Sequence, residues 1–193
     1  MEKVCSFFGH RKIEKTAELR EKLINTVRSL IIEKRVSKFL FGDKSAFDDF
    51  CQEIVKELMG EFPYIKRVYV RTMYPELGEP YLGYILRDFE DTYVPKGVEN
   101  AGVARYVERN QAMINASDYC IFYYNPDYQP PRRKYSKRAV GDYQPKSGTQ
   151  LAYNYANQRK FGEKEITIIN LCENVDREIV KNSFNPYLGN CFR

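Results

Sequence analysis

The chain has 193 residues, with 31 lysines and arginines against 26 aspartates and glutamates and a net charge of +5. A chain of this length can bury a sizeable core without disulfides or metal ions, and we expect one domain over residues 1–193. Six basic and two acidic residues lie between 125 and 146, so this loop alone holds +4 of the net charge. Near-neutrality elsewhere disfavours a general nucleic-acid-binding face.

The cysteine and histidine content bears on compartment and cofactors. Five cysteines, odd in number and widely separated, fit a reducing cytosol, so we expect a cytoplasmic protein. His10 is the only histidine and no Cys-x-x-Cys pair occurs, so we expect no metal site and no cofactor. No apolar run approaches the roughly 20 residues of a membrane span, which disfavours a membrane partner.

The first half of the chain predicts two strand–helix units. Residues 4–8 form a β-prone run that ends at Gly9, and apolar residues then recur at helical spacing from Leu19 to Ile31. A second apolar run at 39–41 ends at Gly42. Ser45, with Asp48 three residues later, is typical of the capping box that opens a helix, which we expect to end before Gly60.

The rest of the chain predicts three further strands, at 68–70, 119–124 and 166–171. Residues 72–100 lose periodicity, and we interpret them as a surface excursion with one short helix near 81–87. Helices are expected at 101–116 and 147–159, with a further one near 176–182, and a basic loop rich in proline and tyrosine at 125–146. This alternation predicts an α/β, Rossmann-like three-layer fold with a mostly parallel five-stranded sheet and helices on both faces.

Parallel sheets bind ligands beyond the carboxyl ends of their strands, so the residues that follow each strand should cluster. The Ser-Gly-Thr segment opens a helix whose first amides lack internal partners, which suits an anion. Each position also has a purely structural interpretation: serine and threonine are ordinary helix caps, and Gly-Asp and His-Arg are ordinary turn residues. The candidate ligand-binding residues are Gly9, His10, Arg11, Gly42, Asp43, Ser147, Gly148 and Thr149.

The helix at 101–116 adds two more candidates. Its periodicity places Val103, Tyr106, Val107 and Ile114 on one face, with Asn110 in the middle of this apolar stripe and Arg109 at its edge. A buried amide must bond to protein or to ligand, because leaving it unpaired costs about 1–3 kcal/mol. Arg109 can either join a surface ion pair or bind a ligand anion through its two-pronged guanidinium.

Several of these segments together resemble a known family. Arg109-Asn110-x-x-Met113, Ser117-Asp118, the apolar strand after them, Gly148-Thr149 and Tyr155-Ala156 are similar to the YpsA-like branch of the SLOG superfamily. This Rossmann-like group contains DNA-processing protein A and the cytokinin-activating LOG phosphoribohydrolases, and Gly9-His10-Arg11 resembles its Gly-x-Arg turn. The resemblance spans nearly the whole chain and implies a nucleotide-derived ligand, with Arg109, Gly148 and Thr149 as site positions.

The chain departs from LOG enzymes at the acid that assists cleavage of the N-glycosidic bond. Their Pro-Gly-Gly-x-Gly-Thr-x-x-Glu run ends in a glutamate, but here Ala152 stands three residues after Thr149. A carboxylate stabilises the cationic sugar of such a reaction, so its loss disfavours hydrolysis unless Glu90, Asp91 or Glu108 substitutes.

The leading hypothesis is therefore a cytosolic sensor or regulatory protein for a nucleotide-like, phosphate-bearing small molecule. The first alternative is a nucleotide N-glycosidase with a relocated acid. The second is single-stranded nucleic-acid binding through loop 125–146, whose basic residues alternate with tyrosines. The sequence is compatible with a homo-oligomer.

Overall fold

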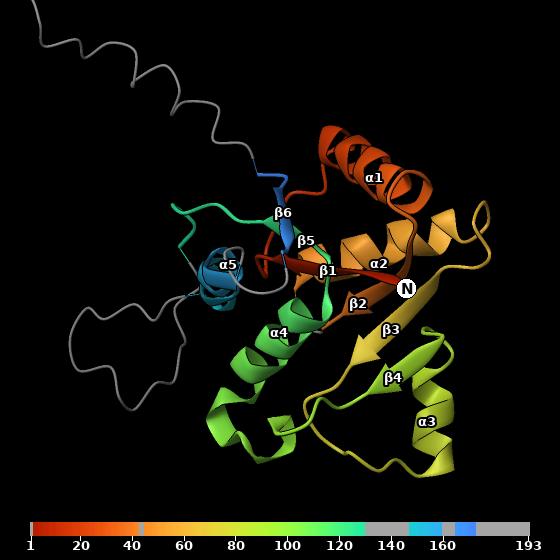
Figure 1. The fold of residues 1–193 in the computed structure, drawn as a ribbon, viewed down its shortest axis with the longest axis vertical. Coiled ribbons are helices and arrows are strands. Elements are labelled where there is room, and N and C mark those ends of the chain that lie inside the picture. Colours follow the sequence, from red (N-terminus) through yellow and green to blue (C-terminus); the bar gives the residue numbers. More distant parts are fainter. Residues whose placement is uncertain (1, 43–44, 130–146, 160–164, 173–193) are drawn as a thin grey trace, which may run out of the picture.

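The computed structural model describes residues 2–42, 45–129, 147–159 and 165–172 (Figure 1). Their strands form one sheet in the order β4-β3-β2-β1-β5-β6, and every neighbouring pair is parallel. The strands are β1 (Lys3–Gly9), β2 (Val36–Phe41), β3 (Lys66–Val70), β4 (Asp91–Tyr93), β5 (Tyr119–Tyr123) and β6 (Thr167–Asn170). The helices are α1 (Ala17–Ile32), α2 (Ala46–Leu58), α3 (Glu79–Ile85), α4 (Arg105–Ala116) and α5 (Gly148–Arg159).

The expected Rossmann-like α/β class is confirmed, but the expected number of five strands is wrong. The additional strand is β4, which lies inside the segment 72–100 and pairs with β3. Three residues are too few to produce a period of two in the sequence, so β4 left no pattern to detect. The short helix expected in this segment exists as α3, which begins at Glu79 with a proline in its first turn. The helix expected at 176–182 and most of loop 125–146 lie outside the described residues.

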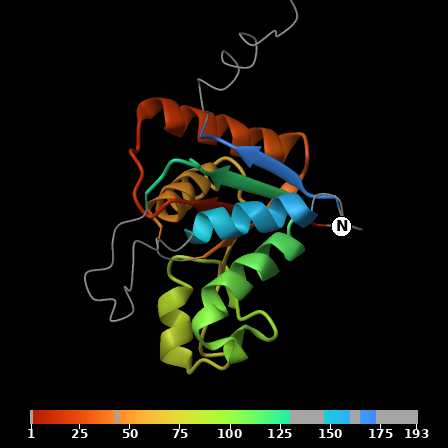
Figure 2. The same ribbon diagram turned by 90° about the vertical axis from the view of Figure 1, so that its left-hand side faces the viewer.

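Each face of the sheet has its own core. Alternate residues of β1 point to opposite faces, so that Cys5 and Phe7 pack with α1 and α2, whereas Phe8 packs with α4 and α5. Figures 1 and 2 show the two pairs of helices on opposite sides of the sheet. The helices that follow β1 and β2 thus cover one face, and those that precede and follow β5 cover the other.

Because of this arrangement, the order of the strands reverses between β1 and β5. A reversal of this kind is the topological switch point of an open α/β sheet, and in such sheets ligands bind beyond the carboxyl ends of the strands that flank it. The fold therefore predicts a ligand site next to the residues that follow β1 and β5.

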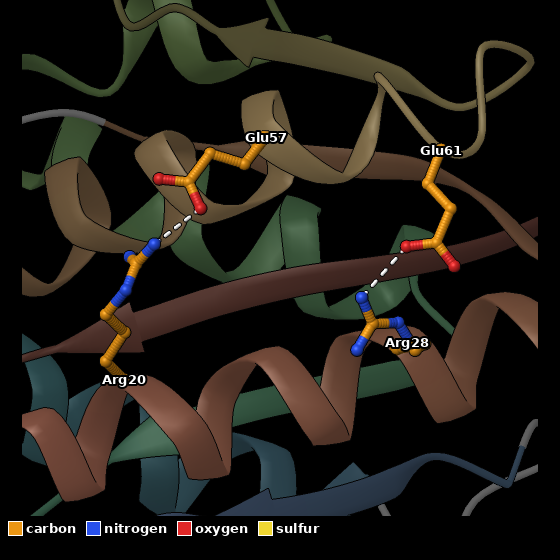
Figure 3. A network of polar contacts seen from close by, with 4 residues as sticks. All are labelled: Arg20, Arg28, Glu57 and Glu61. Carbon is orange, nitrogen blue, oxygen red and sulfur yellow. Dashed lines mark hydrogen bonds and ion pairs between the residues drawn. The ribbon is translucent and has the colours of Figure 1, made fainter.

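Helix α2 begins as the sequence predicts. Ser45 Oγ accepts a hydrogen bond from the backbone N–H of Asp48 at 2.9 Å. Two ion pairs connect α1 to α2 and to the turn after it, from Arg20 to Glu57 in α2 at 2.5 Å and from Arg28 to Glu61 in the turn at 2.8 Å (Figure 3). All four side chains are about half exposed, so each pair stabilises the fold by at most about 1 kcal/mol.

Helix α4 begins later than expected, at Arg105 rather than at 101. Residues 98–100 and 102–104 form two short 3₁₀ turns, η1 (Val98–Asn100) and η2 (Gly102–Ala104). Gly102, with a φ of 55°, has a backbone conformation that an α-helix excludes. Val103 consequently lies outside the helix and is fully exposed, and the buried residues of α4 are Arg109, Met113 and Ile114.

Candidate functional site

The carboxyl edge of the sheet brings together most of the candidate residues. Gly9 ends β1 and His10 follows it, Gly42 follows β2, and Asn125 lies two residues beyond the end of β5. Thr149, in the first turn of α5, donates a hydrogen bond from Oγ1 to the carbonyl of Gly9 at 2.7 Å. The predicted cluster at the ends of β1 and β5 therefore exists, and it lies at the switch point.

His10 occupies the centre of this region and is buried. Its Nε2 accepts a hydrogen bond from the backbone N–H of Asn125 at 2.9 Å, which joins the ends of β1 and β5. The ring of Tyr128 stacks on the imidazole with a centroid separation of 3.8 Å. Burial lowers the pKa of His10 from its ordinary value of 6.5, so the ring is neutral at pH 7.

The neutral ring has one hydrogen bond left to make. Because Nε2 is an acceptor, the proton of the neutral imidazole resides on Nδ1. In the part of the chain that the structure describes, this buried Nδ1 has no hydrogen-bond partner. Buried donors are normally satisfied, so Nδ1 is suited to an acceptor on a bound molecule.

The first turn of α5 uses both of its hydroxyl groups within the protein. Ser147 Oγ accepts from the backbone N–H of Gln150 at 3.0 Å, as a helix cap, and Thr149 Oγ1 bonds to Gly9 as described above. The backbone amides of Gly148 and Thr149 have no acceptor inside the helix. Gly148 is exposed, and within the described residues nothing lies within 4 Å of the position that its Cβ would take. The anion-binding capacity of this turn thus comes from its amides and not from its hydroxyls.

Arg109 reaches the carboxyl edge of the sheet from α4, on the face opposite to α2. Its side chain is 4% exposed, and its guanidinium lies so close to Gly42 that a Cβ there would be 2.8 Å from Nη2. The carboxylate of Asp48 lies beside the same point, at 3.2 Å from it. Arg109 Nη2 also donates to Asn110 Oδ1 at 3.3 Å, and the guanidinium lies 5.6 Å from the ring centroid of Tyr106.

This geometry corrects the expected positions of two residues. Arg109, and not Asn110, lies on the buried face of α4. The helix begins at Arg105, and the burial of Met113 and Ile114 fixes which of its faces is turned to the core. Asn110 is half-buried and bonds to Arg109, so its amide is satisfied by protein. Arg11 is exposed, and its carbonyl accepts from the N–H of Ala46 at 3.2 Å. Asp43 lies outside the described residues.

Sequence reasoning missed two residues of this edge. Asp48 was interpreted only as a member of a helix cap, although its position in the first turn of α2, six residues after Gly42, places it at the carboxyl end of β2. Arg71 follows β3 directly and is 7% exposed. The position of Arg71 directly after a buried strand could have identified it as a residue of this edge. The residues that follow Arg71 have no periodicity, and the whole segment was therefore interpreted as a surface excursion.

The three acids considered for a relocated catalytic role lie elsewhere or are exposed. Glu90 pairs with Arg67 at 2.8 Å, and both are at the amino ends of β3 and β4, at the opposite edge of the sheet. Burial opposes the ionisation of Glu90, but its hydrogen bonds with Arg67 and the charge of that residue outweigh burial and lower the pKa of Glu90. Asp91 and Glu108 are exposed.

Comparisons with known proteins found a structural similarity but no family. Neither a scan against models of protein families nor a search of curated proteins found a match. Among solved structures, the chain is similar to the X-ray structure of TM1055, a structural genomics target, at 13% identity and a TM-score of 0.45. The alignment covers 93% of this chain and 99% of that chain. The α/β assignment rests on the strand pairings described above. In the described residues, no helix has the length and hydropathy that crossing a membrane requires.

Proposed function

We propose that the protein binds a nucleotide or nucleotide-derived, phosphate-bearing molecule at the carboxyl edge of its sheet, as a cytoplasmic sensor or regulatory module. The observation that carries this proposal is the pairing of α5 with His10 at the switch point. The bond from Thr149 to Gly9 fixes the first amides of α5 next to His10, whose buried Nδ1 has no partner among the described residues. All of these groups are hydrogen-bond donors, and phosphate oxygens are acceptors.

The residues take separate roles in this proposal. The amides of Gly148 and Thr149 bind phosphate oxygens at the positive end of the α5 dipole. His10 donates a hydrogen bond from Nδ1 as a neutral ring. It therefore recognises the position of an acceptor atom on the ligand and not the ligand's negative charge. Arg109 lies beside Gly42 and contributes positive charge, with Asn110 orienting its guanidinium. The resemblance to the SLOG superfamily favours a nucleotide over other anions.

Gly148 offers a clean test, because it is the first helical residue of α5. Proline is well tolerated at this position but removes the N–H, whereas alanine keeps it. We expect a nucleotide panel, assayed by thermal shift and calorimetry, to contain a ligand that stabilises the wild type and Gly148→Ala equally. Gly148→Pro should bind it more weakly by about 1.5–3 kcal/mol, which is roughly ten- to a hundredfold in Kd.

Two results would refute the proposal. One is a panel in which no nucleotide stabilises the wild type at concentrations up to 1 mM (roughly the weakest affinity of interest). The other is a ligand that Gly148→Pro binds as tightly as Gly148→Ala. Arg109→Lys, which keeps the charge and loses the two-pronged geometry, should also weaken binding, with Arg28→Gln on the far face as the matched control.

A second function is favoured by one specific observation, the carboxylate of Asp48 beside Arg109 at Gly42. The resemblance to LOG enzymes implies an acid that works with the arginine, and Ala152, at the expected position of that acid, is buried in the core. Asp48 can stabilise a cationic sugar in its place, which gives hydrolysis of an N-glycosidic bond. Release of free base from a nucleoside monophosphate, abolished by Asp48→Asn and unaffected by Glu90→Gln, would support this function. Release that Asp48→Asn leaves intact would exclude Asp48 from the reaction.

A further inference from the structure

Three exposed tyrosines lie together beyond the carboxyl end of β3. Tyr74, Tyr81 and Tyr84, the tyrosine cluster, are 58%, 48% and 64% exposed. The ring centroids of Tyr74 and Tyr81 are 6.1 Å apart and those of Tyr81 and Tyr84 are 6.4 Å apart. Large aromatic side chains that gather on a surface usually mark a site of interaction, because their rings gain by being covered.

The backbone of Tyr74 is held in an unfavourable conformation. Its φ is 58°, in the left-handed region that bulky residues rarely adopt. Arg71 stabilises this turn by donating from Nη1 to the carbonyls of Met73 and Tyr74. The turn brings the rings of Tyr74 and Tyr81 into an edge-to-face contact at the surface, with an angle of 76° between their planes.

Arg71 is a buried cation whose described partners are all neutral. Besides the two carbonyls, its Nε donates to Thr92 Oγ1 at 2.9 Å. Among the described residues, no carboxylate lies within ion-pair distance of Arg71. A second guanidinium, that of Arg105, borders the same turn with its Nη1 3.0 Å from Met73 Sδ. A buried charge without an opposite charge is unfavourable, so this place is suited to a bound anion.

We propose that Arg71 and Arg105 bind the phosphate of a nucleotide-type small molecule whose base stacks on the tyrosine cluster. A small molecule fits better than a nucleic-acid strand, because the exposed charges of residues 73–88 are mainly acidic and repel a polyanion. They are Glu76, Glu79 and Asp88 against Arg87.

This subsite is separate from the site proposed at the switch point. The ring of Tyr106 lies between the two arginines of α4, 5.5 Å from Arg105 and 5.6 Å from Arg109. The subsite uses neither His10 nor the amides of α5, so it goes beyond the function proposed above.

The test uses the full chain labelled with 3-fluorotyrosine and ¹⁹F NMR, with AMP as the probe. Phenylalanine variants assign the resonances of the three cluster tyrosines. We expect AMP to shift the resonances of Tyr74 and Tyr81, and inorganic phosphate or adenosine alone to bind more weakly. If AMP shifts none of the cluster, or if a thymidine oligonucleotide binds and AMP does not, the proposed ligand class is wrong.

Two variants separate binding from folding. Tyr74→Gly keeps the left-handed turn without strain and removes the ring, so it should fold at least as stably as the wild type and yet bind AMP about tenfold more weakly. Arg71→Gln should weaken AMP by a similar factor, with Arg28→Gln as the control. Gly148→Pro should leave the AMP shifts of the cluster unchanged. Unaltered affinity in Tyr74→Gly, or loss of the shifts in Gly148→Pro, would overturn the assignment of a separate subsite.

Discussion

Substitution of Gly42 by alanine tests the position of Arg109 without removing its charge. The φ of Gly42 is not in the left-handed region, so alanine fits the backbone. Its Cβ would lie 2.8 Å from Arg109 Nη2 and 2.9 Å from Cζ, which is closer than non-bonded atoms approach. The guanidinium must therefore move, although it is buried and bonded to Asn110.

The expected cost can be worked out from two opposing effects. Overpacking of a buried site costs about 1–3 kcal/mol. The lower entropy of the unfolded chain with alanine offsets about 0.4–1 kcal/mol of this. The net loss lies between roughly 0 and 2.6 kcal/mol. For a chain of this size the Tm falls by about 2–4 °C for each kcal/mol. At Gly148, where nothing described lies within 4 Å of a Cβ, alanine should instead stabilise by about 0.4–1 kcal/mol.

Urea unfolding followed by tyrosine fluorescence measures both variants, since the chain has no tryptophan. If Arg109 causes the loss, Gly42→Ala should cost little in an Arg109→Ala background, where the two closest atoms are absent and only Asp48 Oδ2, at 3.2 Å from the Cβ, stays near. The double-mutant cycle then gives a coupling energy near the loss itself. Gly42→Ala as stable as Gly148→Ala, or an unchanged loss in the Arg109→Ala background, would show that the guanidinium lies elsewhere.

Three further predictions concern stability. Gly9→Ala should destabilise by about 3 kcal/mol in urea unfolding, more than Gly42→Ala, because its Cβ would lie 2.3 Å from the buried ring of Phe47; an equal or smaller loss would contradict this. The free energy of unfolding should fall as pH drops from 6.5 to the lowered pKa of His10 in the folded chain, by up to about 1.4 kcal/mol per pH unit, because in this window the unfolded chain protonates His10 and the folded chain does not. His10→Gln should lack that slope, and parallel curves would be inconsistent with a buried neutral ring. Glu90→Gln should cost about 1.5–3 kcal/mol, since glutamine keeps only one of the two oxygens that accept hydrogen bonds from Arg67 and loses the negative charge, whereas the exposed Glu99→Gln should cost almost nothing. The advantage of the wild type over Glu90→Gln is present above the ordinary pKa of 4.5 and is lost as pH falls through the lowered value in the folded chain.

The sequence predicted the parts of this molecule that depend on local pattern. A buried strand followed by glycine is visible at Gly9 and Gly42, and the rule that parallel strands end at one edge brings these ends together. The hydroxyl of Ser147 could be expected to cap α5, which the structure confirms. These inferences need only the order of elements and the chemistry of helix ends.

The parts that escaped prediction depend on contacts between distant segments. The face that α4 buries follows from where the helix begins, and that is decided by the turns at 98–104, which have no helical period. Thr149 satisfies its hydroxyl on Gly9, 140 residues away, which no spacing in the sequence encodes. Arg71 is buried because the turn at Met73 and Tyr74 folds over it, and that turn has a tyrosine where glycine would be the recognisable signal.

The two glycines at the ends of β1 and β2 explain why the site forms at this edge. They project to opposite faces of the sheet: Gly9 faces α2 and admits the ring of Phe47, whereas Gly42 faces α4 and admits the guanidinium of Arg109. Each glycine lets a helix approach the strand ends more closely than any side chain would allow. Because adjacent strands lack a side chain on opposite faces of the sheet, α2 and α4 can both place polar groups beyond the strand ends. Asp48 and Arg109 therefore lie together beside Gly42. The polar edge is thus a consequence of missing side chains as much as of charged ones.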